Sequence, residues 1–121
     1  MAKTISEDAI KPRERLLGAA YDLFAANGIS QVGIDTILTK SGCAKASLYS
    51  TFGSKDGLVR AYLETRHVAR RGRLLAEIER HDDPRTRLLA IFDVLADTVA
   101  QPGFRGCAFG ATSITHKSGS V

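Results

Sequence analysis

The sequence predicts an all-α fold, in which a three-helix domain with a helix-turn-helix is followed by a long linking helix and a partial C-terminal helical domain. Apolar residues recur at intervals of three and four along most of the 121 residues, which is the period of a helix that buries one face. Glycine or a Pro-Gly pair follows several of these segments, where helices commonly end. No segment shows the alternation that is typical of a strand.

The first predicted helix begins at Pro12 and ends before Gly28. Proline fits the first turn of a helix, where its missing N–H is not needed, and glycine commonly follows the last turn. Lys11, Arg13 and Arg15 stand at the start of this helix, where positive charge opposes the helix dipole. They indicate either a solvated terminus or contact with a DNA backbone. The apolar face comprises Leu16, Leu17, Ala20, Tyr21 and Phe24.

A short polar connection, Gly28 to Gly33, then leads to two short helices with a tight turn between them. Ile34, Ile37 and Leu38 share one face of the first short helix. Gly42 follows directly, where helices commonly end on a residue in the left-handed region that glycine adopts without strain.

The second short helix has an unusual outer face. Leu48 and Phe52 mark its inner face, and the remaining positions are small, basic or hydroxyl-bearing, without any acidic residue. Short side chains let a helix backbone approach a DNA groove closely, and they leave donors for phosphates and base edges. We therefore interpret residues 33–52 as a DNA-binding helix-turn-helix. The outer positions are Lys45, Ala46, Ser47, Tyr49, Ser50 and Thr51.

A long, weakly amphipathic helix is predicted next, capped by Ser54 and reaching about Arg80. Its middle, Arg66 to Arg73, is strongly basic, which favours a solvated helix face over a second DNA site. Asp83 and Pro84 then begin a helix with the clearest apolar stripe of the chain. The apolar positions of the long helix are Leu58, Tyr62, Ala69, Leu75 and Ile78, and the stripe of the following helix is Leu88, Ile91, Phe92, Leu95 and Val99.

The two ends of the chain are simpler. A last helical segment is expected from Phe104 to Thr115. Met1 to Ile10 has no helical period and is expected to form an arm, and the last six residues are expected to form a ragged end.

Charge and composition limit the possible functions. The net charge is +4, and the first 80 residues hold 13 Lys and Arg against 9 Asp and Glu. The rest of the chain is balanced at 4 against 4, so the positive excess coincides with the helix-turn-helix, as expected for a nucleic-acid partner. There is no apolar run of membrane-spanning length and no secretory signal, which predicts a cytoplasmic protein without a membrane partner.

The cysteines and histidines show no spacing that suggests chemistry. Cys43 and Cys107 form no CxxC pair, and the three histidines share no pattern, so we expect no metal, no cofactor and no catalytic residue. An enzyme is disfavoured further because there is no nucleophile–base spacing, no Gly-rich phosphate loop and no pair of carboxylates. Cys43 could be a thiol switch, but packing as a small apolar residue is favoured.

The first predicted helix, the helix-turn-helix and the start of the long helix together resemble the DNA-binding domain of the TetR family of transcriptional regulators. The similarity covers about Pro12 to Leu63, and the run from Gly42 to Lys55 is its most specific part. It implies a TetR-type helix-turn-helix DNA-binding domain over residues 12–60, with its motif at about 33–52, and a partial ligand-binding and dimerisation domain over residues 61–121. The matching residues are Leu23, Phe24, Gly28, Ile34, Ile37, Gly42, Leu48, Tyr49, Phe52, Ser54, Lys55 and Leu58.

The resemblance implies a ligand-responsive repressor that binds a palindromic operator in double-stranded DNA as a homodimer, with a small-molecule effector in the full-length form. It does not indicate which residues bind the effector. By position, Lys45, Ala46 and Ser47 would face the major groove, while Tyr49, Ser50 and Thr51 would lie at the groove wall or on phosphate. Lys55 would contact phosphate, and Gly33 completes the set of implied DNA-binding positions.

This chain departs from the family pattern in four ways. Val32 and Gly33 stand where the family usually has a Thr or Ser cap. Ala44 replaces the usual Ser cap of the next helix, which costs about 1 kcal/mol of helix stability. Leu38 stands where a small residue is usual. Family members also continue with further helices, so the alternative function is a truncated DNA-binding module without a working sensor domain. In that case the apolar stripe from Leu88 to Val99 would be left exposed.

Overall fold

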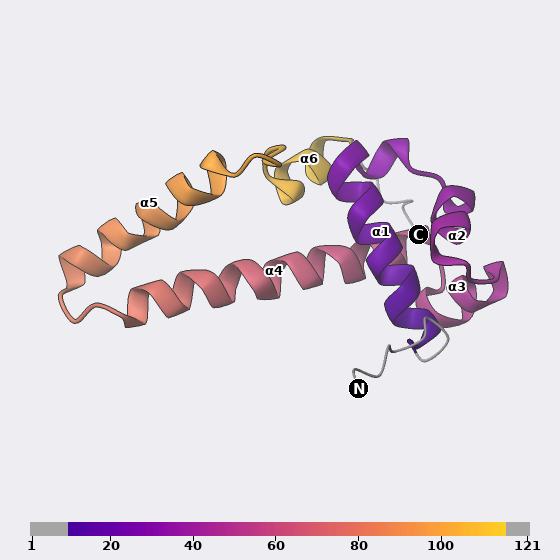
Figure 1. Cartoon of the computed structure of the whole chain (residues 1–121), viewed down its shortest axis with the longest axis horizontal. Coiled ribbons are helices and arrows are strands. Elements are labelled where there is room, and N and C mark those ends of the chain that lie inside the picture. Colours follow the sequence, from indigo (N-terminus) through magenta and orange to yellow (C-terminus); the bar gives the residue numbers. More distant parts are fainter. Residues whose placement is uncertain (1–9, 116–121) are drawn as a thin grey trace, which may run out of the picture.

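The computed structural model describes residues 10–115, and within this range the chain contains only helices, turns and loops (Figure 1). The prediction of an all-α fold is therefore confirmed. The expected arm at residues 1–9 and the expected ragged end at 116–121 lie outside the described residues. No helix in the described range is long and apolar enough to cross a membrane. The elements are α1 (Pro12–Asn27), η2 (Ile29–Gln31), α2 (Ile34–Ser41), α3 (Lys45–Phe52), α4 (Lys55–Glu79), α5 (Pro84–Ala100) and α6 (Ala108–Thr115).

One hydrophobic core holds the N-terminal helices together. It is formed by α1, η2, α2, α3 and the beginning of α4, and the apolar periods predicted for these helices supply most of its members. Tyr62 of α4 makes edge contacts with two rings of α1, at centroid distances of 5.4 Å from Tyr21 and 5.3 Å from Phe24. The buried residues are Leu16, Ala19, Ala20, Phe24, Ile29, Val32, Ile37, Leu48, Leu58, Val59 and Tyr62.

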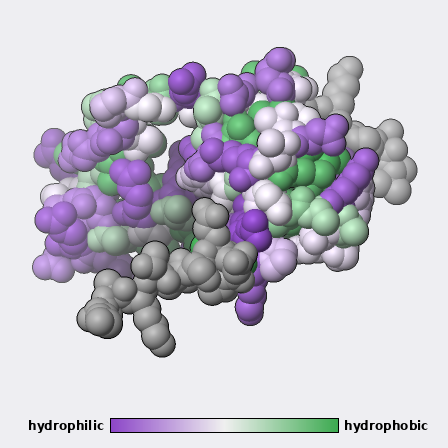
Figure 2. Space-filling model, turned by 45° about the vertical axis from the view of Figure 1, so that its right-hand side comes forward, coloured by the Kyte–Doolittle hydropathy of each residue, from purple (hydrophilic) through white to green (hydrophobic). Residues whose placement is uncertain are grey.

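The second half of the chain is an arm that extends from this core. After the turn at residues 80–83, α5 runs back along α4, and the two helices form the antiparallel pair on the left of Figure 1. The space-filling view shows an opening between the two helices of this arm (Figure 2). Only one face of α5 lies against α4, with Ala90 buried and Ile91, Val94 and Thr98 half-buried.

The predicted apolar stripe of α5 is largely exposed. Leu88, Phe92 and Val99 are about 60% exposed, at 59%, 62% and 59%, and Leu95 is 37% exposed. Two positions assigned to the apolar face of α4 were wrong, because Ala69 and Leu75 are also exposed. Beyond the core, α5 is the helix that packs along α4, and the outer face of α4 is left to solvent.

The helix caps follow the sequence signals. The hydroxyl oxygen of Ser54 accepts a hydrogen bond from the Gly57 N–H at 3.1 Å, which begins α4. The carboxylate of Asp83 accepts hydrogen bonds from the N–H and the hydroxyl of Thr86, at 3.0 and 2.9 Å, which begins α5. These bonds hold the pKa of Asp83 below its usual value.

Two local predictions were wrong. The segment from Gly28 to Gly33 is more than a polar connection, because the single turn of η2 directs Ile29 and Val32 into the core, where they are 5% and 3% exposed. The last helix begins at Ala108 rather than Phe104, because Gly106 has φ 86°, which a right-handed helix cannot contain.

Gly28 provides a test of this core. Its φ of 82° with ψ of 151° is a conformation that essentially only glycine adopts, so Gly28→Ala should lower the free energy of unfolding by about 1–3 kcal/mol. Gly18→Ala is the control, because Gly18 is exposed inside α1 with open space around it. That change should raise stability by about 0.5–1 kcal/mol. Urea unfolding measures both, and equal effects would contradict this account of Gly28.

Candidate nucleic-acid interface

The turn between α2 and α3 is closed by a small network of hydrogen bonds. Gly42 is in the left-handed region, with φ 65° and ψ 19°, and its N–H donates to the Leu38 carbonyl at 2.9 Å. The buried hydroxyl of Ser41 donates to the same carbonyl and accepts from the Cys43 N–H, both at 3.2 Å. Sequence analysis missed Ser41, because a serine before a glycine is an ordinary helix end and its burial depends on tertiary packing.

Cys43 packs against the hydrophobic core, in agreement with the favoured interpretation of this residue. Its side chain is half-buried, and its Sγ lies 3.9 Å from the Pro12 carbonyl oxygen. Within residues 10–115, no group of three or more His, Cys, Asp or Glu side chains could hold a metal ion.

The start of α1 lies against the helix-turn-helix. The Arg13 guanidinium stacks over the Phe52 ring, 5.6 Å from its centroid. The Arg15 guanidinium lies beside Gly42, since a Cβ added to that glycine would be 2.8 Å from Arg15 Nη2. Two of the three basic residues left open by the sequence therefore pack on the motif, and they bring positive charge next to α3.

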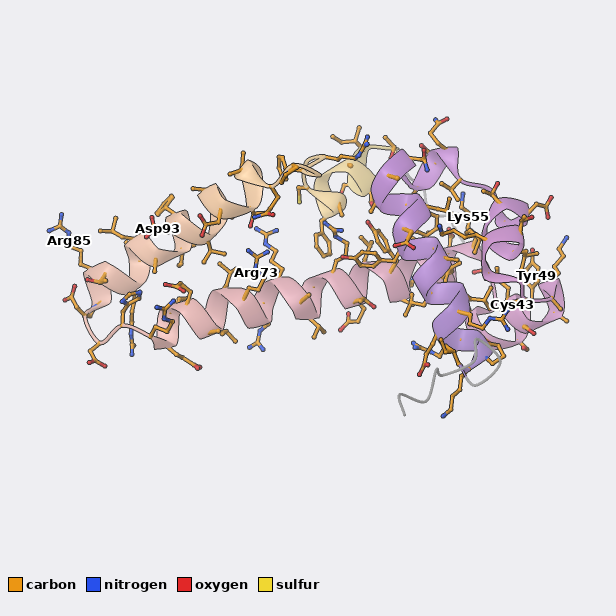
Figure 3. The ribbon with its side chains drawn as sticks, viewed as in Figure 1. Cys43, Tyr49, Lys55, Arg73, Arg85 and Asp93 are labelled. Atoms are coloured by element: carbon orange, nitrogen blue, oxygen red, sulfur yellow. The ribbon has the colours of Figure 1, made fainter. Side chains whose placement is uncertain are left out.

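The outer face of α3 is open to solvent. Leu48 is fully buried and holds the helix on the core, while Ser47 and Phe52 are half-buried. Tyr49 is 44% exposed and lies at the end of the molecule opposite the arm (Figure 3). The other exposed residues of α3 are Lys45, Ala46, Ser50 and Thr51.

The first turns of α2 and α3 both lack a side-chain cap. Gly33 and Ala44 occupy the N-cap positions, as the sequence suggested, and neither provides a side-chain acceptor. Helix N-termini present N–H groups and the positive end of the helix dipole, which favours anions such as phosphate. Both termini can therefore receive an anion from outside the chain.

Lys55, unlike the exposed predicted residues of α3, directs its side chain toward another segment of the chain. Its side chain is half-buried, and its Nζ donates a hydrogen bond to the Ile29 carbonyl at 3.1 Å (Figure 3). It thereby joins the start of α4 to η2. Six of the predicted residues share α3, Gly33 stands at the start of α2, and Lys55 has a hydrogen-bond partner within the chain.

Comparison with known proteins gives matches to one family of regulators. Residues 16–62 match the family model described as bacterial regulatory proteins, tetR family. The chain is 32% identical over 66 residues to the HTH-type transcriptional regulator SrpR of Pseudomonas putida, covering 54% of this chain and 31% of that protein. It is 35% identical over 78 residues to an uncharacterized HTH-type transcriptional regulator of Mycobacterium tuberculosis, covering 63% of this chain and 38% of that protein.

Solved structures agree over a longer part of the chain. A TetR-family transcriptional regulator from Streptomyces coelicolor superposes with a TM-score of 0.80 and 36% identity, covering 85% of this chain and 55% of that one. A putative TetR transcriptional regulator from Streptomyces avermitilis superposes with a TM-score of 0.77 and 34% identity, covering 88% of this chain and 57% of that one. The chain thus spans little more than half the length of these solved chains, and less of the curated relatives.

The different settings of two lysines can be tested without DNA. Lys55→Ala should lower the free energy of unfolding by about 1 kcal/mol, because it removes a charged donor from the backbone carbonyl of the buried Ile29. Lys45→Ala, at the exposed start of α3, should leave stability within about 0.5 kcal/mol. Urea unfolding of both variants provides the measurement. A loss with Lys45→Ala as large as that with Lys55→Ala would contradict these assignments.

Proposed function

We propose that this chain, whose residues 16–62 match the TetR family of transcriptional regulators, acts as a repressor that binds a palindromic operator as a homodimer until a small-molecule effector binds. The single observation that best supports DNA binding is the exposed, acid-free face of α3, which Leu48 fixes on the core. We propose residues 12–60 as the DNA-binding domain, residues 61–121 as part of the effector and dimerisation domain, and the cytoplasm as the location.

Each residue on the outer side of α3 has a proposed role. Lys45, Ala46 and Ser47 begin the helix, and in helix-turn-helix proteins the N-terminal part of the recognition helix contacts base edges. The lysine donates to base or phosphate oxygens, while the short side chains allow close approach. Tyr49 and Thr51 contact the groove wall or phosphate, as does Ser50, although its hydroxyl also donates to the Ser47 carbonyl at 3.2 Å.

Phosphate contacts are proposed around this helix. Gly33 begins α2 without a side chain that could compete with an incoming phosphate for the N–H groups of the first turn. Lys55 uses one of its three ammonium hydrogens for the Ile29 carbonyl, which leaves two for phosphate. Positive charge from Arg13 and Arg15 lies close by, at the start of α1.

Lys45→Ala tests base recognition. On an operator selected from random duplexes, this change should weaken binding by about 1–3 kcal/mol and relax preference at one base pair, with a smaller effect on a scrambled duplex. Lys40→Ala is the matched control, because it removes the same charge from α2, where Lys40 is 3.9 Å from Asp22. It should change binding to the two duplexes equally. Competition binding at constant salt is the measurement, and a uniform loss with Lys45→Ala would remove base recognition from this residue.

Pairing of two chains is tested on the DNA. One recognition helix covers only a few base pairs, so helix-turn-helix proteins pair two half-sites about 34 Å apart. Sedimentation should find two chains on the selected duplex, and a duplex with one half-site should bind far more weakly. The free chain should associate weakly at micromolar concentration through exposed apolar residues of α5. Tight binding of one chain to one half-site would exclude the homodimer.

A further inference from the structure

A cavity of about 280 Å³ lies between α4, α5 and the start of α6. Arg66, Arg70 and Arg73 line it from α4, at spacings of four and three residues that set them on one face of the helix. Figure 3 shows Arg73 directed from α4 into the space between α4 and α5. The basic run that sequence analysis assigned to a solvated face therefore contributes three guanidinium groups to one cavity.

These three positive charges face no carboxylate. The residues that line the cavity include no Asp or Glu, and within residues 10–115 none of the three arginines forms an ion pair. Arg66 is half-buried, while Arg70 and Arg73 are exposed. Three like charges on one helix face repel one another, and a bound anion would offset that repulsion while accepting paired hydrogen bonds from guanidinium groups.

The opposite wall of the cavity is mostly apolar, although Thr98 and Cys107 also line it. Side chains of α5 and of the segment leading to α6 complete it, so a ligand there would meet charge on one side and hydrocarbon on the other. The volume is near the lower end for small-molecule sites, which suits a short chain or a single ring and excludes a nucleic-acid strand. The apolar residues of this wall are Val94, Leu95, Val99, Phe104, Ala108 and Phe109, and Ala69 and Leu74 of α4 add to the apolar lining.

Cys107 lines the same cavity, and the lowered pKa of its thiol indicates that negative charge is favoured there. Hydrogen bonds from the backbone N–H groups of Gly110 and Phe109, together with the positive charge of Arg70, hold the pKa of its thiol below the usual value, although burial acts in the opposite direction. Negative charge is thus stabilised on the α6 side of the cavity as well as on the α4 side.

Arg66 also connects the cavity to the DNA-binding domain. Its guanidinium lies 3.4 Å from the Tyr21 hydroxyl and stacks over the rings of Tyr21 and Tyr62, at 5.5 and 5.8 Å from their centroids. Tyr21 belongs to α1, which packs against both α2 and α3. An anion that draws Arg66 toward the cavity would therefore act on a contact that supports the helix-turn-helix.

We propose that this cavity binds a small organic anion with an apolar body, with Arg66, Arg70 and Arg73 holding the anionic group and α5 and α6 covering the apolar part. Such a ligand would be the effector, and that step rests on the proposed function of the preceding subsection. Binding of an anion to the cavity does not require DNA. Anion binding and the effect of the anion on operator affinity are therefore measured separately.

Octanoate and octan-1-ol, which share a chain length and differ in charge, are suitable probes on the full chain. Octanoate should bind more tightly by about tenfold or more, as measured by isothermal titration. Arg70→Gln combined with Arg73→Gln should remove most of this preference. Arg71→Gln combined with Arg85→Gln is the matched control, because it removes two exposed charges that do not line the cavity. Equal binding of both probes, or an equal loss in both double variants, would overturn the proposal.

The two cysteines give a second readout that does not depend on variants. At each cysteine we compare the alkylation rate by iodoacetate with the rate by neutral iodoacetamide. The ratio of the two rates should be higher at Cys107 than at Cys43, and octanoate should slow alkylation of Cys107 alone. Mass spectrometry of the two peptides measures both effects. Protection by octan-1-ol as strong as that by octanoate would refute an anion site. If octanoate binds as expected but leaves operator affinity unchanged, the anion site stands and its role as effector site fails.

Discussion

The structure depends on α4 belonging to both halves of the molecule. Its first two turns bury Leu58, Val59 and Tyr62 in the N-terminal core, and the same continuous helix then forms one side of the arm. Tyr62 is the largest fully buried side chain of the described part, and its ring contacts fix α4 against α1. Because α4 is one continuous helix of 25 residues, it connects the arm directly to the core without an intervening loop.

The short helix α3 shows how a DNA-facing element can be both exposed and ordered. Eight residues are too few for a helix to be stable alone in water, so its order comes from packing. Leu48 supplies that packing from below, and Arg13 over Phe52 supplies it from the side. The outer residues are consequently not needed for folding, which leaves them available for contact with a partner.

The sequence was sufficient to predict the starts and ends of helices, where structure is determined by neighbouring residues. Proline and serine or aspartate marked the helix starts, and glycines at positive φ marked the ends of α1 and α2, because these effects act within one turn. The burial of Ser41 and Ile29, and the hydrogen bond of Lys55 to η2, could not be predicted, because they depend on segments up to 26 residues apart. Exposure of Ala69 and Leu75 was missed for the same reason, since periodicity identifies an apolar face but not what covers it.

Arg66 contacts both the N-terminal core and the cavity of the arm. From the sequence it was one member of a basic run, and in the structure it is shared between an aromatic pair of the core and a cavity of the arm. A ligand that competes for this guanidinium can change DNA affinity only by the difference between its affinities for the DNA-bound and free forms. By thermodynamic linkage, the operator must then change the affinity for the ligand by the same factor. Such couplings typically amount to about 1–3 kcal/mol, which is within the range of a single charged contact.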